Sequence, residues 1–168
     1  MTRDDIIGFV IAEEGGIVDN GADPGGRTNR GITQRYLNAA RVSQPDMSLP
    51  ATVDELTVEQ TAELYRRDEW SQIHGDELPP GIALLVMDCA VNSGPARAVK
   101  LLQLALGITA DGVPGPATLA AANTAPPSLE DEYVARHAVW FASLYDTENV
   151  FELGWMRRLV KAFRLAIT

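Results

Sequence analysis

Three polar residues, Glu14, Asp23 and Thr28, follow one another within fifteen positions near the N-terminus. Glu14 ends an apolar helical pattern, where the free carbonyl groups of a helix disfavour an ionised carboxylate. Asp23 and Thr28 lie in a polar, glycine-rich stretch, where a carboxylate stays ionised. Glycosidic bond cleavage needs two such unlike acids: one protonates the leaving oxygen, and the other steadies positive charge or directs a water. A threonine hydroxyl can help to hold that water.

Each of these residues also has a purely structural interpretation. Glu13 and Glu14 are then solvated acids at a helix end, Asp23 is a turn-former before Pro24, and Thr28 is a hairpin residue. On a helical wheel, Glu14 lies nearer than Glu13 to the centre of the apolar stripe. Glu14 is therefore the better candidate for a partly buried, protonated acid.

The elements that must position these residues are a helix and a turn-rich segment. Thr2 can cap the helix, and Asp4 and Asp5 suit the positive end of its dipole. The apolar stripe consists of Ile6, Ile7, Val10 and Ile11, and the helix must end at Gly15 and Gly16. Residues 17–31 are rich in Gly, Asn, Asp and Pro, which predicts turns and a short hairpin.

The remaining sequence shows helical patterns, with residues 43–54 as a loop. A helix is expected after Thr33, and another from Thr57, where Thr57 and Gln60 have capping-box spacing, toward Trp70. Further helices are expected over about 80–91, 95–106, 117–124, 127–144 and 152–167. The fold class is therefore mainly α, with one small β-hairpin near the N-terminus.

Length, charge and cysteine content exclude several classes of protein. The 168 residues, 46% of them hydrophobic, are ordinary for one soluble domain, so we expect a single domain over residues 1–168. A net charge of -9 argues against binding to nucleic acid. One cysteine and two histidines allow no disulfide within the chain and argue against a metal site, so we expect no metal and no cofactor.

The two ends of the chain differ in character. The N-terminus lacks the pattern of a signal peptide, so we expect synthesis in the cytoplasm. Residues 152–168 carry four basic residues against one acidic residue. We expect one helical stripe of Met156, Leu159, Val160, Phe163 and Ile167 and another side with Arg157, Lys161 and Arg164. Either the stripe docks on the domain and the basic side is solvated, or the basic side attracts anionic wall polymers or membrane.

Residues 13–33, EEGGIVDNGADPGGRTNRGIT, resemble the signature of the glycoside hydrolase family 108 muramidases. This group of the lysozyme superfamily includes phage-type endolysins. The resemblance implies that Glu14 is the catalytic acid. Glu14, Asp23 and Thr28 also approximate the Glu/Asp/Thr arrangement of phage lysozymes, with the second interval one residue shorter here.

Two further segments carry the same resemblance. Residues 88–122, with the pattern LQxALGxxxDGxxGPxTL, resemble the peptidoglycan-binding segment of that family, and residues 151–158, FELGWMRR, resemble its closing segment. The resemblance implies one continuous lysozyme-like domain, with a catalytic segment over 1–75 and a peptidoglycan-binding region over 76–168. It implies hydrolysis of the β-1,4 bond between N-acetylmuramic acid and N-acetylglucosamine.

The expected partner is bacterial peptidoglycan, and the expected site of action is the cell wall or periplasm. We expect a monomer that reaches the wall through a holin-type pore. Asn92, Trp70 and Tyr65 are candidate substrate-binding residues: Asn92 to line a sugar cleft, and the two aromatic rings to stack on a sugar. The alternatives are a helix cap for Asn92 and core packing for both rings.

Other functions fit the sequence less well. The segment GGRTNRG lacks the Gly-Lys-Ser/Thr of a phosphate loop, and DNGADP has Pro where a calcium loop needs Gly. The alternative from another class is a non-catalytic peptidoglycan-binding or secretion-accessory module that keeps the fold without turnover. The intact set of Glu14, Asp23 and Thr28 argues against that alternative.

Overall fold

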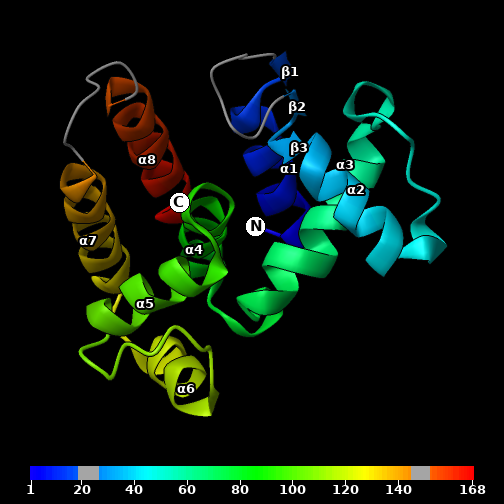
Figure 1. Ribbon diagram of the computed structural model, residues 1–168. Coiled ribbons are helices and arrows are strands. Elements are labelled where there is room, and N and C mark those ends of the chain that lie inside the picture. Colours follow the sequence, from blue (N-terminus) through cyan, green and yellow to red (C-terminus); the bar gives the residue numbers. More distant parts are fainter. Residues whose placement is uncertain (19–26, 145–151) are drawn as a thin grey trace. The chain divides into compact units, whose positions relative to one another are not determined.

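The computed structural model describes residues 1–18, 27–144 and 152–168, which form helices and one small sheet (Figure 1). The chain divides into two compact units. Residues 7–68 form the first, called here the N-terminal unit, and residues 1–6 with 69–168 form the second, called the helical unit. Within the described residues, no helix is both long and apolar enough to cross a lipid bilayer.

Helix α1 spans Arg3–Glu14, as predicted, and its two ends follow local rules. The backbone N–H of Asp5 donates to the Thr2 hydroxyl (3.2 Å), and the N–H of Thr2 donates to the Asp5 carboxylate (2.8 Å). This reciprocal cap satisfies two free amides and lowers the pKa of Asp5. Gly15 ends the helix with φ +73°, a conformation that side chains disfavour.

The small sheet has three antiparallel strands in the order β1-β2-β3, where a single hairpin was expected. The strands are β1 (Ile17–Val18), β2 (Thr28–Asn29) and β3 (Ile32–Thr33). Asn29 pairs with Ile17 on one side and with Ile32 on the other. The third strand forms because Arg30 and Gly31, with φ +50° and +79°, make a two-residue turn of the type that matches strand twist.

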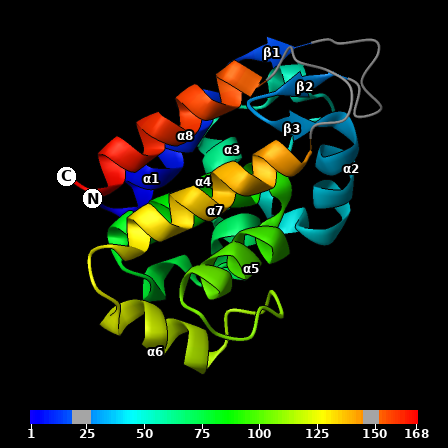
Figure 2. The ribbon, with the colours of Figure 1, turned by 90° about the vertical axis from the view of Figure 1, so that its left-hand side faces the viewer.

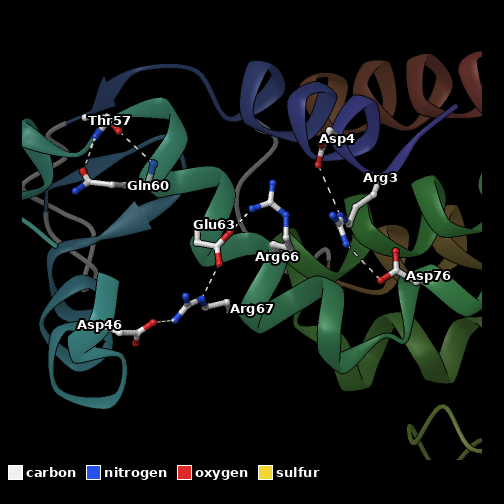
Figure 3. Close-up of polar contacts among 9 residues, drawn as sticks. All are labelled: Arg3, Asp4, Asp46, Thr57, Gln60, Glu63, Arg66, Arg67 and Asp76. Carbon is white, nitrogen blue, oxygen red and sulfur yellow. Dashed lines mark hydrogen bonds and ion pairs between the residues drawn. The ribbon is translucent and has the colours of Figure 1, made fainter. Parts of the chain in front are cut away.

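Two capped helices complete the N-terminal unit. Helix α2 (Gln34–Ser43) begins at Thr33, whose hydroxyl accepts from the N–H of Tyr36 (3.0 Å). Helix α3 (Val58–Tyr65) begins with the predicted capping box of Thr57 and Gln60 and continues as the π-helical turn η3 (Arg66–Trp70) (Figure 3). The expected loop between them contains the short 3₁₀ turns η1 (Pro45–Met47) and η2 (Val53–Glu55).

Charged side chains orient these segments (Figure 3). Arg67 lies between Asp46 (2.6 Å) and Glu63 (2.7 Å), and it lowers the pKa of both carboxyls. Arg66 also pairs with Glu63. Such partly exposed pairs contribute little free energy, so their main effect is to fix the loop before α3.

The helical unit is built around α4 (Pro80–Ser93), whose residues 81–90 are all buried. A helix that is apolar on all sides must be covered on all sides. Helices α5 (Pro95–Ala105), α7 (Leu129–Ser143) and α8 (Glu152–Ala166) pack against it, with α7 and α8 side by side (Figure 2). The short elements η4 (Gly75–Glu77) and α6 (Pro116–Thr124) complete the unit.

A buried ion pair sets the rotation of α8. Asp88 on α4 accepts from Arg158 on α8 at 2.6 Å, and their side chains are only 3% and 13% exposed. The buried face of α8 therefore contains Leu159 and Ala162, whereas Val160 and Ile167 are exposed. The prediction that Val160 and Ile167 share the docked stripe is wrong. The sequence pattern did not account for Arg158, which faces inward toward Asp88.

Candidate active site

Glu14, the last residue of α1, faces the tight turn between β2 and β3. Glu14 is half-buried, and a β-carbon placed on Gly31 would lie 2.9 Å from its Oε2 atom and against the hydroxyl of Tyr65. The Glu14 carboxylate, the Tyr65 hydroxyl and the Arg30–Gly31 backbone therefore converge on one point. Only glycine leaves room for this approach, and it also accepts the positive φ at this position.

The turn beside Glu14 is held by hydrogen bonds from three side chains. The Tyr65 hydroxyl, at the end of α3, donates to the carbonyl of Arg30 (2.8 Å). Arg30 donates to the carbonyl of Leu56 (3.0 Å), and the buried Asn29 amide donates to the carbonyl of Val53 (2.7 Å). The position of the turn relative to η2 and α3 is thus fixed by groups distant in sequence.

Thr28 lies on β2, and its side chain is half-buried. Its hydroxyl is within 3.4 Å of the carbonyl of Val18 on β1, to which it donates. The hydroxyl oxygen keeps its capacity to accept a hydrogen bond. Just before it, Arg27 pairs with Asp54 on η2 (2.6 Å), which ties this end of the glycine-rich segment to the rest of the unit. Asp23 lies outside the described residues.

The three candidate substrate-binding residues have different surroundings. Tyr65 is 2% exposed and Trp70 is 4% exposed, and the Trp70 ring packs against Gly75. These values fit the core alternative for both rings, because stacking on a sugar needs an open ring face. Asn92 is exposed at the end of α4, where its amide donates to the carbonyl of Asp88 (2.7 Å).

Sequence reasoning did not identify two features of this site, the Arg30–Gly31 turn and the role of the Tyr65 hydroxyl. The pair Arg-Gly before the apolar Ile32 was the available signal for a two-residue turn. No sequence signal brings Tyr65 to Glu14, since the two residues lie 51 positions apart and converge only once the chain has folded.

The motif in residues 102–119 organises a loop of the helical unit. The buried Gln103 donates to the Asp111 carboxylate (2.7 Å), the Val113 carbonyl (3.0 Å) and the Thr118 hydroxyl (3.1 Å). It also accepts from the N–H of Gly112 (2.8 Å). The N–H of Val113, which donates to the Asp111 carboxylate (2.9 Å), and the Gln103 amide lower the pKa of Asp111. Together these hydrogen bonds hold the turn that leads into α6.

A mainly helical chain with a small antiparallel sheet and a half-buried glutamate at a helix end has the features of a lysozyme-like glycoside hydrolase. Comparison with protein families gives the same result: residues 7–94 match the model of Glycosyl hydrolase 108, and residues 97–160 match that of the Predicted Peptidoglycan domain. The chain therefore belongs to the glycosyl hydrolase 108 family. The chain is therefore a glycoside hydrolase, and the polymer on which it acts is peptidoglycan.

A solved structure supports this assignment. The chain is similar to SagA of Brucella abortus, with 34% sequence identity and a TM-score of 0.82 over 98% of this chain and 93% of that chain. The predicted family and fold class are confirmed. Among curated proteins, no sequence matches the chain.

The family models and the packing divide the chain at different places. The two family models meet between residues 94 and 97, at the end of α4, whereas the compact units meet at residues 68 and 69. Helix α4 thus matches the hydrolase model by sequence but packs among the helices of the peptidoglycan-domain model. The expected boundary at residues 75 and 76 lies between these two divisions.

Proposed function

We propose that this chain hydrolyses the β-1,4 bond between N-acetylmuramic acid and N-acetylglucosamine in peptidoglycan, with Glu14 as the general acid. The observation that carries this proposal is the convergence of the Glu14 carboxylate, the Tyr65 hydroxyl and the Gly31 turn. Glu14 protonates the leaving oxygen, a role for which a half-buried carboxyl on a rigid helix end is well suited. Membership in the glycosyl hydrolase 108 family supports the reaction class.

A second group must steady the oxocarbenium-like state or direct a water. We assign this role to Asp23, assisted by Thr28. The support for this assignment is the polar, glycine-rich sequence around Asp23 and the position of Thr28 on β2, in the same unit as Glu14. Release to the wall through a holin-type pore, as for a phage endolysin, remains part of the proposal.

The test compares two adjacent glutamates. Glu14→Gln and the matched control Glu13→Gln are incubated with purified sacculi, and turbidity and newly formed reducing ends are measured. We expect Glu14→Gln to lose nearly all activity with an unchanged melting temperature, and Glu13→Gln to stay near wild type. The reverse result, with an active Glu14→Gln and an inactive Glu13→Gln, would contradict the assignment of the acid.

Asp23→Asn tests the second role, with Asp19→Asn as its control from the same segment. We expect Asp23→Asn to lower turnover strongly and to keep binding to sacculi, because the amide cannot carry the negative charge. Turnover at the wild-type level in Asp23→Asn would reduce Asp23 to a turn-forming residue.

A further inference from the structure

A groove lies between α5 and α7 in the helical unit, entirely within the segment that matches the Predicted Peptidoglycan domain. Its volume is about 430 Å³. The lining combines Arg97, Arg136 and Glu132 with mainly apolar side chains, among them Leu104, Val139 and Trp140. The motif residue Gln103 on α5 is buried against the loop described above, so the part of this segment that can face a ligand lies elsewhere.

Arg97 is held in place by an aromatic ring. Its guanidinium carbon lies 3.8 Å from the centroid of the Trp140 ring, and the Trp140 indole N–H donates to the Ser93 hydroxyl (3.4 Å). No carboxylate of the described residues pairs with Arg97. A guanidinium stacked on a ring keeps its N–H groups in its own plane, where they can bind a carboxylate with two hydrogen bonds.

The opposite side of the groove carries a second guanidinium and apolar surface. Arg136 pairs with Glu132 through its Nη2 atom (2.6 Å), while its buried Nε–H has no hydrogen-bond partner among the described residues. Leu104 is 42% exposed and Val139 is 70% exposed. A ligand that fits must therefore supply both a carboxylate and small apolar groups.

We propose that this groove binds the stem peptide of peptidoglycan, with a peptide carboxylate on Arg97 and alanine methyl groups against Leu104 and Val139. The stem peptide has this composition, and its negative charge complements a local cationic site on a chain whose net charge is -9. The sugar strand fits less well, because the Arg97 guanidinium covers a face of Trp140 on which a sugar ring would stack. The choice of peptidoglycan as the polymer rests on the proposed function. The groove and its lining are observed independently of that function.

Calorimetric titration of the intact wild-type chain tests this site with three soluble probes. The first is an alanine-containing stem tetrapeptide without sugar, the second is the same peptide with its carboxylates amidated, and the third is a chitin oligosaccharide without peptide. A glycosidase leaves all peptide bonds of the first probe intact, so binding is measured without turnover. The variants are Arg97→Gln and, as a charge-matched control on α2, Arg41→Gln, which is exposed.

We expect the free peptide to bind, and Arg97→Gln or amidation of the peptide to weaken binding about tenfold or more, as for loss of a charge-assisted hydrogen bond. Arg41→Gln is expected to bind as wild type. Equal affinities in Arg97→Gln and Arg41→Gln would overturn the proposal. So would a free peptide that gives no binding heat, whether or not the chitin oligosaccharide binds. A reducing-end assay on the same samples reports bond cleavage separately, so failure of the groove and failure of the proposed reaction are distinguishable.

Discussion

Gly31 leaves the space in which the candidate acid lies beside the β2–β3 turn. A methyl group added at Gly31 would meet the Glu14 carboxylate and the Tyr65 hydroxyl. The backbone φ of +79° at Gly31 also strains any residue with a side chain. We expect Gly31→Ala to lower turnover on the order of a hundredfold, because small displacements of a catalytic group cost that much. The backbone strain should also cost about 1 kcal/mol or more of stability.

The matched control is Gly8→Ala on α1, where a methyl group meets nothing within 4 Å. We expect it to keep full turnover and to gain a little stability, since alanine favours a helix. Reducing-end release from sacculi and thermal unfolding give both values. Full activity in Gly31→Ala would show that Glu14 does not depend on this turn.

We expect Tyr65 to act through the turn rather than on the sugar, because its side chain is buried. Tyr65→Phe removes the hydrogen bond to the Arg30 carbonyl, which should cost about 1 kcal/mol of stability and lower kcat with little change in KM. Tyr36→Phe also removes a tyrosine hydrogen bond in the same unit, from Tyr36 to the Asp68 carboxylate. We expect this control to lose at least as much stability, because its partner is charged, and to keep kcat. Equal kcat values in the two variants would assign Tyr65 a structural role only.

The buried histidine of α7 should make stability depend on pH. His137 is fully buried between Tyr133 and Phe141, and burial, with a smaller effect of Arg158, lowers its pKa from 6.5 to about 4. Below pH 6.5 the unfolded chain binds a proton that the folded chain does not. The free energy of unfolding should therefore fall as the pH decreases from 6.5 to 4, by about 3 kcal/mol in all.

His137→Phe tests this dependence by denaturant unfolding at several pH values. Neither ring nitrogen has a hydrogen-bond partner among the described residues, so the substitution removes no such bond. We expect the variant to match wild type near pH 7 and to lose less stability toward pH 4. Parallel pH profiles for the two proteins would show that His137 is not responsible.

At the scale of elements, sequence patterns located the helices well because each helix carries its own signals. The capping residues Thr2, Thr33 and Thr57 all accept hydrogen bonds at the starts of their helices. The third strand was missed because strands of two residues are too short to show alternation. The rotation of α8 was missed because it depends on Asp88, a residue on another helix.

The exposed side of α8 carries both apolar and basic side chains: Leu153, Val160, Arg157, Lys161 and Arg164. We expect the triple variant with Gln at the three basic positions to fold normally and to lose about 1 kcal/mol or less of binding to sacculi, because exposed charges act weakly at physiological salt. The control is Arg35→Gln with Arg41→Gln on α2. Sedimentation with sacculi at several salt concentrations measures the effect, and global unfolding of the triple variant would contradict the solvent-facing position of these residues.

For the whole molecule, the sequence predicted the family, the mainly helical fold and Glu14 as the candidate acid. Composition alone predicted none of these; they came from the motif in residues 13–33 and from the helix pattern before it. The convergence of α1, the β2–β3 turn and α3 could not be read from the sequence, because it depends on Tyr65 reaching Arg30 across 35 residues. The same holds for the groove of Arg97 and Trp140, which lie 43 positions apart on two helices.

The central claim is which bond the chain cleaves, and the chemistry of the new chain ends tests it most directly. Sacculi are digested with wild-type protein, the products are reduced with borohydride, and the reduced sugars are identified by mass spectrometry. The proposed reaction predicts N-acetylmuramitol at the new ends, and its absence after digestion with Glu14→Gln. N-acetylglucosaminitol, or new amino groups without new reducing ends, would contradict the proposed bond.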